Sequence, residues 1–152
     1  MNNKQSRVIL LVEDNEDHAE IARFHITDYA PEIDVEWLGD GEQAMRHIEQ
    51  EHGRSGGRYP WLILLDIKLP KYDGHEVLAH LKAHESMRKI PVVMFTTSNA
   101  TNDIDRALKA GANSYVQKPV EAGEFGRTVC KIIDYWKLNQ HALIVERMNA
   151  DD

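Results

Sequence analysis

Three segments of the chain are apolar at every position: residues 8–12, 62–65 and 92–95. A strand that is apolar throughout has both of its faces covered, which is typical of a central strand in a parallel sheet. Residues 35–37 alternate between apolar and polar, and residues 114–116 form a further short run. We predict that these two segments are strands nearer the edges of the same sheet.

Between these segments, apolar residues recur at spacings of three and four, as on one face of a helix. The stripe after the first strand comprises Ala19, Ala22, Ile26 and Tyr29, and the longest stripe comprises Phe125, Val129, Ile132, Ile133 and Trp136. Shorter stripes occur within residues 44–48, 77–81 and 104–108. The order strand then helix, five times over, predicts an α/β fold with a parallel sheet and helices on both faces.

Local signals refine the ends of these elements. Asn15, and either Ser98 or Asn99, are predicted N-caps, and Gly111 is a predicted helix stop. Residues 51–60 are rich in glycine and polar residues, so we expect a long flexible loop there.

Length and charge narrow the class of protein. The 152 residues fit one domain, and 25 acidic against 18 basic residues give a formal net charge of −7. This charge argues against DNA binding through phosphate contacts and against a basic membrane anchor, and no segment is apolar enough to span a bilayer. A single cysteine excludes an internal disulfide, which favours a reducing compartment such as the cytoplasm.

Reactive side chains follow the predicted strands. Glu13 and Asp14 follow the first strand, Asp66 the third, Thr96 the fourth and Lys118 the fifth. Ligands bind beyond the carboxyl ends of the strands in an open α/β sheet, so we expect these side chains to meet at one edge. Clustered carboxylates need a cation, and oxygen ligands without His or Cys suit Mg²⁺. An Asp carboxylate can also form an aspartyl-phosphate, and a metal, a Lys and a hydroxyl would stabilise that transfer.

This constellation resembles the receiver domain of bacterial two-component response regulators. The motifs that carry the resemblance are Leu-Val-Glu13-Asp14, Leu-Leu-Asp66-Ile-Lys-Leu-Pro70-Lys-Tyr-Asp73-Gly74, Phe-Thr96-Thr97 and Tyr115-Val-Gln-Lys118-Pro119. The resemblance implies a flavodoxin-like sandwich of three layers, with five parallel strands in the order 2-1-3-4-5 and five helices. It extends from about residue 8 to residue 136, so we expect a receiver domain over residues 7–136 and an extension over residues 137–152.

The resemblance also implies a role for each site residue. Asp66 would accept the phosphoryl group, and Glu13 and Asp14 would hold Mg²⁺ together with Asp66 and the backbone carbonyl of Lys68. Thr96 would bond the phosphoryl oxygen, and Lys118 would pair with the phosphate. Tyr115 would be the aromatic switch residue, which turns inward when Thr96 moves toward the phosphate. The Lys118–Pro119 peptide bond is expected to be cis. Thr97 is larger than is usual for the family, which leads us to expect a long-lived phosphoryl group.

The partners follow from the same resemblance. A sensor histidine kinase would donate the phosphoryl group, and a downstream protein would receive the signal, because the chain has no room for an output domain. Several features, including the Asp134-Tyr135-Trp136 segment, are similar to regulators associated with phytochromes, which often form homodimers. We therefore regard a phytochrome-type kinase as a candidate donor, and Leu143-Ile144-Val145 as a candidate dimer contact in a tail that would otherwise be frayed.

Other functions share some of these features. A haloacid-dehalogenase-type Mg²⁺-dependent phosphatase also uses an Asp nucleophile, but it needs a second Asp where this chain has Lys68. A flavodoxin-like protein would have to bind the phosphate of its flavin at this first loop, where the four acidic residues within 13–17 would repel that phosphate. A third alternative is a receiver-like scaffold that is never phosphorylated. His80 and His84 lie one helical turn apart, but no third metal ligand is fixed by the sequence, so a solvated helix face is the favoured interpretation.

Overall fold

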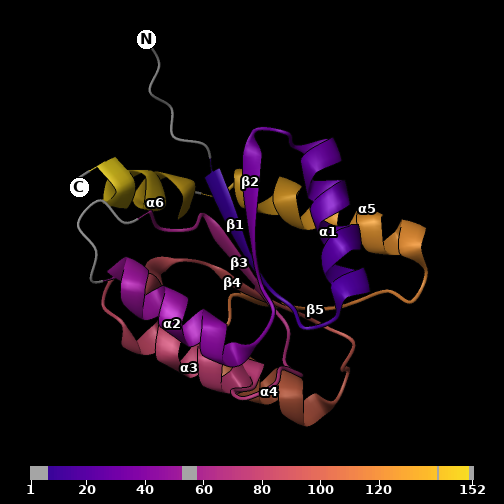
Figure 1. Ribbon diagram of the computed structural model, residues 1–152, viewed down its shortest axis with the longest axis horizontal. Coiled ribbons are helices and arrows are strands. Elements are labelled where there is room, and N and C mark those ends of the chain that lie inside the picture. The colour runs from indigo at the N-terminus through magenta and orange to yellow at the C-terminus, as the bar shows by residue number, and fades with distance from the viewer. Residues whose placement is uncertain (1–6, 53–57, 140, 151–152) are drawn as a thin grey trace.

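The computed structural model describes residues 7–52, 58–139 and 141–150. Its centre is one parallel sheet in the order β2-β1-β3-β4-β5 (Figure 1). The strands are β1 (Arg7–Val12), β2 (Ile33–Leu38), β3 (Leu62–Leu65), β4 (Val92–Thr96) and β5 (Ser114–Gln117). This order confirms the prediction, and it places the two less apolar strands, β2 and β5, at the edges.

Helices cover both faces of the sheet. They are α1 (Glu16–Tyr29), α2 (Gly41–His52), α3 (Gly74–Ala83), α4 (Thr101–Lys109), α5 (Ala122–Lys137) and α6 (His141–Ala150), with a short 3₁₀ helix, η1 (Met87–Lys89). Figure 1 shows α2, α3 and α4 on one side of the strands, and α1 and α5 on the other. The resemblance implied five helices, and α6 is an addition to that number.

The core has two halves, one on each face of the sheet. Alternate residues of β1 enter opposite halves: Ile9 and Leu11 pack toward α1 and α5, whereas Leu10 and Val12 pack toward α2 and α3. Successive side chains of a strand point to opposite faces, so a strand covered on both faces is apolar at every position. The interpretation of the continuous apolar runs as central strands is therefore confirmed.

The sixth helix packs across the end of the sheet at which the strands begin. Val145 is 3% exposed and packs within the α2/α3 half of the core, and Ala142 packs within the α1/α5 half. Glu146 lies 3.5 Å from the guanidinium of Arg7, and Asn149 accepts a hydrogen bond of 2.8 Å from the backbone N–H of Tyr59. The predicted dimer contact is therefore wrong for Val145, because its side chain is buried in its own molecule.

The ends of the helices agree only in part with the predicted caps and loop. The Asn15 side chain caps α1 by accepting a bond of 3.1 Å from the His18 N–H, and Gly111 ends α4 with φ of 102°, as predicted. The predicted cap of α4 is wrong, because α4 begins after Ala100. Within the expected loop over residues 51–60, α2 continues to His52, and residues 53–57 lie outside the described part of the chain.

Among the described residues, no helix is both long enough and apolar enough to cross a membrane.

Candidate functional site

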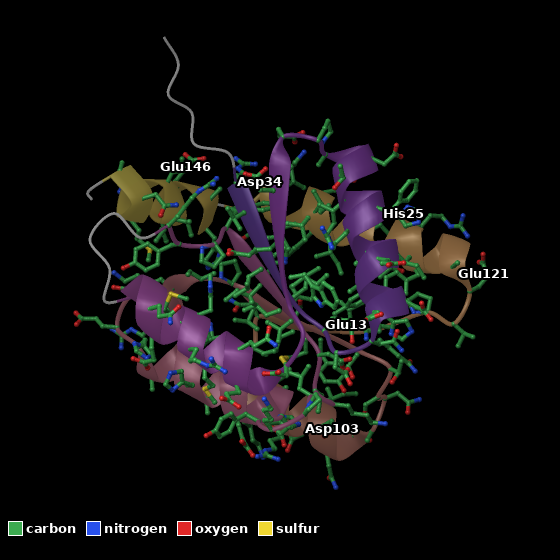
Figure 2. The ribbon with its side chains drawn as sticks, viewed as in Figure 1. Glu13, His25, Asp34, Asp103, Glu121 and Glu146 are labelled. Atoms are coloured by element: carbon green, nitrogen blue, oxygen red, sulfur yellow. The ribbon has the colours of Figure 1, made fainter. Side chains whose placement is uncertain are left out.

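Four polar side chains are buried together beyond the carboxyl ends of the strands. Glu13 is 2% exposed, Asp66 7%, Thr96 0% and Lys118 4%. Because Val12 pairs with Leu65 in the sheet, the residues that follow them, Glu13 and Asp66, leave adjacent strands side by side. Figure 2 shows Glu13 at the end of the sheet where β1 leads into α1, with Glu146 at the opposite end. The structure thus brings together the residues that the sequence placed at this edge.

Lys118 connects the two buried carboxylates. Its Nζ donates a hydrogen bond of 2.8 Å to Asp66 Oδ2 and a second bond to Glu13 Oε1. Its backbone N–H donates to the Thr96 carbonyl at 2.7 Å, which fixes the lysine next to the end of β4. The expected cis bond between Lys118 and Pro119 is wrong: the described residues contain no cis peptide bond, and Lys118 reaches both carboxylates with a trans bond.

The pKa values of the two buried carboxyl groups are shifted in opposite directions. Burial, and then the neighbouring charge of Asp66, raise the pKa of Glu13 from 4.5 to about 7. Burial alone would also raise the pKa of Asp66, but the positive charge of Lys118, together with hydrogen bonds from Lys118, Thr96 and Glu13, outweighs burial and holds that pKa below its usual value. One ammonium is thus insufficient to neutralise both acids, and the site favours an additional cation.

The acidic side chains fit a hard divalent cation. Carboxylate oxygens of Glu13, Asp14 and Asp66 all lie within 4.8 Å of one another, and Asp14 is exposed, so an ion can enter from solvent. Glu13 is held in place by its backbone carbonyl, which accepts a bond of 2.7 Å from the Trp37 ring N–H, and by its carboxylate, which accepts from the Asn15 N–H at 3.2 Å. A donor set of oxygens alone is the one that Mg²⁺ prefers.

The loop after β3 orients Asp66 and positions Lys68. The Ile67 N–H donates to Asp66 Oδ1 at 2.7 Å, and the Ile67 carbonyl accepts from the N–H groups of Leu69 at 3.0 Å and Gly74 at 2.8 Å. These bonds turn the chain tightly around Lys68, two residues after Asp66. The side chain of Lys68 is exposed, as is that of Thr97 after β4.

His18 belongs to the site, although no motif or spacing in the sequence pointed to it. Its Nδ1 lies 3.1 Å from Lys118 Nζ and 3.9 Å from Glu13 Oε1. Burial, and then the charge of Lys118, lower the pKa of His18. Its position in the first turn of the helix that follows Glu13 was the signal that could have indicated it.

A chain of polar contacts extends from the end of β4 to α3. Ser98 donates from Oγ to Asp103 Oδ2 at 2.6 Å, and the other oxygen of Asp103 lies 3.0 Å from Nε2 of the buried His75. The hydroxyl of Tyr115 donates to the Ser98 carbonyl at 2.9 Å. Tyr115 is thus attached to the segment that directly follows Thr96. No periodicity or strand-end signal in the sequence pointed to Ser98, Asp103 or His75 as a connected group.

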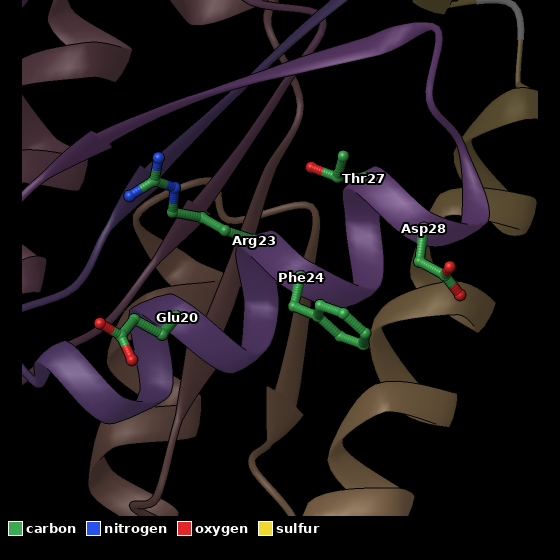
Figure 3. A pocket seen from close by; sticks show the side chains of 5 residues that line it. All are labelled: Glu20, Arg23, Phe24, Thr27 and Asp28. Atoms are coloured by element: carbon green, nitrogen blue, oxygen red, sulfur yellow. The ribbon is translucent and has the colours of Figure 1, made fainter.

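A shallow hollow lies elsewhere, along the outer surface of α1 (Figure 3). It is lined by the exposed side chains of Glu20, Arg23, Phe24, Thr27 and Asp28. These residues belong to one helix, and none of them takes part in the groups of three metal-ligating side chains found among the described residues. We assign no chemistry to this hollow.

Comparison with known families gives one clear match. The model of the family described as "Response regulator receiver domain" matches residues 9–129. A probable methanogenesis regulatory protein, FilR2 of Methanothrix harundinacea, is 43% identical over 130 residues, which is 85% of this chain and 83% of the relative. Response regulator Rcp1 of Synechocystis sp. is 33% identical over 130 residues, which is 86% of this chain and 88% of the relative.

Solved structures show the same likeness. The phosphorylated cyanobacterial phytochrome response regulator RcpA has a TM-score of 0.81 at 31% identity, covering 88% of this chain and 96% of that one. The Mn²⁺-bound form of Rcp1 has a TM-score of 0.78 at 33% identity, covering 86% and 94%.

Proposed function

Because this chain belongs to the response regulator receiver domain family, it is a phosphoryl acceptor in two-component signalling, and we propose that Asp66 is the acceptor. One observation supports Asp66 above the other acids: its carboxylate is buried and bonded to Lys118 at 2.8 Å, with a pKa held below its usual value. The family match also favours this function over the phosphatase and flavin-binding alternatives. We keep residues 7–136 as the receiver and residues 137–152 as its extension.

The proposed chemistry is a phosphoryl transfer from a phosphohistidine of a kinase. A carboxylate oxygen of Asp66 forms a bond to phosphorus while the bond between phosphorus and the histidine nitrogen breaks, and the nitrogen keeps the electron pair. Lys118 lies where it can pair with an oxygen of the incoming group, and the hydroxyl of the buried Thr96 is a second candidate donor. Glu13, Asp14, Asp66 and the Lys68 carbonyl would hold Mg²⁺, which supplies neutralisation of the phosphoryl charge when bound.

The proposed switch begins at the Lys118–Asp66 bond. Once Asp66 carries phosphate, Lys118 and Thr96 gain a new partner, and a shift of Thr96 would be transmitted to Ser98 and Tyr115, which are bonded to each other at 2.9 Å. Phosphate then changes the balance between two packings of this end of the sheet. A downstream protein that reads the β4–α4 and β5 surface is the proposed receiver of the signal.

Intact mass measurement tests the central proposal. Wild-type protein incubated with a small-molecule phosphodonor and Mg²⁺ should gain the mass of one phosphoryl group. Asp66→Asn should gain nothing, whereas Asp105→Asn, which changes an exposed acid on α4, should behave as wild type. Chelation of Mg²⁺ should abolish the gain. Absence of a gain in wild type with several donors, or a gain that persists in Asp66→Asn, would contradict the assignment.

The donor kinase is proposed from the relatives. RcpA is described as a phytochrome response regulator, and this chain is 31% identical to it, so a phytochrome-type histidine kinase is the candidate donor. Faster transfer to this protein from a phytochrome-type kinase than from an unrelated histidine kinase is the expected result. Equal rates would count against the phytochrome link. The cytoplasmic location stays a prediction, to be checked by cell fractionation.

We also propose a homodimer that uses the outer face of α6. Leu143 is 50% exposed and Ile144 41% exposed, and Leu138, which follows the end of α5, is 82% exposed. Light scattering at micromolar concentration, with and without a phosphoryl analogue, should give the mass of two chains. A monomer under both conditions would remove this proposal.

A further inference from the structure

A second group of metal-ligating side chains lies between α2 and α3. Glu49 extends from α2, whereas His80 lies on α3 and His84 caps the end of the same helix. Glu49 Oε1 lies 2.7 Å from His80 Nε2 and 2.9 Å from His84 Nε2. The sequence showed the two histidines one turn apart without a third ligand, and the tertiary structure supplies that ligand from the neighbouring helix.

The geometry around His80 differs from that of an ordinary ion pair. Its Nε2 atom is buried and makes no hydrogen bond to the described residues, although Glu49 Oε1 is only 2.7 Å away. The carboxylate oxygen therefore lies off the direction in which a ring N–H would donate. His84 Nε2, by contrast, is hydrogen-bonded to Glu49 Oε1 at 2.9 Å. The three ligand atoms all lie within 4.8 Å of one another, and the two ring centroids are 4.9 Å apart.

We propose that Glu49, His80 and His84 form a binding site for Zn²⁺. Imidazole nitrogens with one carboxylate are a ligand set that Zn²⁺ takes in proteins, and three protein ligands leave one position for water or for a partner's side chain. The side chains are 55%, 31% and 16% exposed respectively, so an ion can enter from solvent without rearrangement of the core. The oxygen-only site at Asp66 selects a different, harder ion.

The zinc site lies at the opposite end of α3 from the phosphoacceptor. Gly74 begins α3 against the backbone of Asp66, and His84 follows the last residue of that helix. Ten helical residues span about 15 Å, so the two sites do not share ligands. A bound ion would tie α2 to α3, and because the unfolded chain lacks this arrangement, binding would stabilise the folded protein.

Calorimetric titration with Zn²⁺ in excess Mg²⁺ tests this inference, because Mg²⁺ occupies the acidic site. Wild type should bind one Zn²⁺ and show a raised unfolding temperature. The double variant His80→Gln, His84→Gln should lose this binding, and Glu49→Gln should weaken it by about tenfold or more. The matched controls are Glu42→Gln on the same helix and His141→Gln on α6, and both should bind as wild type does.

Several outcomes would overturn the zinc site: no binding by wild type, binding that survives in the double variant, or binding that is lost in Asp66→Asn. Tighter binding of Ni²⁺ than of Zn²⁺ would overturn the choice of metal. If the double variant does not fold, NMR of wild type decides, because Zn²⁺ should shift the ring signals of two of the eight histidines. Phosphorylation of the double variant should be unchanged, so failure of this proposal is separable from failure at Asp66.

Discussion

At the scale of single residues, the site depends on an imbalance of charge. Lys118 is bonded to both Glu13 and Asp66, and one positive charge cannot stabilise two buried negative charges equally. Asp66 keeps its charge because Lys118 lowers its pKa, whereas Glu13 retains a proton to a higher pH. A lowered pKa suits Asp66 for the proposed role of acceptor, and a bound cation would favour the ionised form of Glu13.

This imbalance predicts how stability depends on pH in the metal-free protein. The pKa of Glu13 is about 7 in the folded protein against 4.5 for an ordinary Glu, so the folded state holds more protons between these values. The free energy of unfolding attributable to Glu13 is therefore fully present below about pH 4.5 and falls as pH rises toward about 7. Urea unfolding of wild type and Glu13→Gln at several pH values should show this fall in the difference between them.

The comparison with Glu13→Gln also reduces the contribution of His18. The lowered pKa of His18 works in the opposite direction, because stability is lost as pH falls, but His18 is present in both proteins. Excess Mg²⁺ should flatten the Glu13 dependence, since the ion favours the ionised carboxylate. A difference between the two proteins that is constant from about pH 5 to about pH 7, or that grows with pH, would contradict the raised pKa.

A second residue-scale prediction concerns the lifetime of the phosphoryl group. Thr97 is exposed and directly follows the buried Thr96 at the end of β4, so we expect it to obstruct water that approaches Asp66. Replacement by a smaller side chain should open that path, so phosphorylated Thr97→Ala should lose its phosphoryl group about tenfold faster than wild type, which corresponds to about 1.4 kcal/mol in the barrier. A time course of intact mass measures both rates. Equal rates would show that Thr97 does not obstruct water.

At the scale of elements, the loop between β3 and α3 begins at Asp66, the proposed acceptor, and meets α2. Lys71 in this loop has φ of 72°, and the backbone of Tyr72 comes so close to Gly41 that a Cβ there would lie 1.8 Å from the Tyr72 carbonyl oxygen. Asp73 caps α3 by accepting from the Glu76 N–H at 2.9 Å. The position of Asp66 is thus determined by close packing of the backbone as well as by Lys118.

Gly74→Ala should disturb this packing. A Cβ at position 74 would lie 2.1 Å from the backbone oxygen of Asp66, so the loop must move. We expect a loss of about 1–3 kcal/mol in the free energy of unfolding, together with slower phosphorylation. Gly39→Ala is the matched control, because a Cβ at position 39 would meet nothing within 4 Å. Urea unfolding and the mass assay measure the two effects, and a Gly74→Ala protein as stable and reactive as the control would refute this account.

A second connection between elements runs through His75. This buried histidine of α3 contacts Asp103 of α4 at 3.0 Å, and Asp103 accepts from Ser98 in the loop that leads out of the site. The contacts tie the start of α4 to α3 on the face where Tyr115 also attaches. Short polar contacts thus connect the segment that follows Thr96 to both α3 and α4.

At the scale of the whole molecule, the two ends of the parallel strands carry different features. The end at which the strands finish carries the acids, Lys118 and the contacts of the proposed switch. At the other end, α6 covers the starts of the strands and joins both halves of the core (Figure 1). The inner face of α6 therefore forms part of the core, and only its outer face is available to a second copy of the chain.

Substitutions at Val145 and Ile144 should separate the roles of these two faces. Val145→Ala removes buried methyl groups and should lower the free energy of unfolding by about 1–2 kcal/mol, whereas Ile144→Ala at an exposed position should cost less than about 0.5 kcal/mol. Ile144→Asp should reduce self-association in light scattering and leave the stability of the monomer unchanged. Equal stability losses for Val145→Ala and Ile144→Ala would contradict the placement of α6.

Much of the fold was determined by the sequence alone. Continuous apolar runs identified β1, β3 and β4 because only strands covered on both faces need apolar residues at every position. The acids, Thr96 and Lys118 lie at or directly after the ends of strands, and parallel strands end at one edge, so their meeting was predictable from order and spacing. The family motifs added the strand order and the choice of Asp66.

Other features depend on contacts between segments far apart in the chain, and only the tertiary structure decided them. Burial of Val145 required the amino edge of the sheet as a partner, and the raised pKa of Glu13 required Asp66 and a water-poor surrounding. Glu49 reached the two histidines only because α2 packs beside α3. A linear pattern shows which face of an element is apolar, but it does not state which neighbour covers that face, and side-chain chemistry follows from the neighbour.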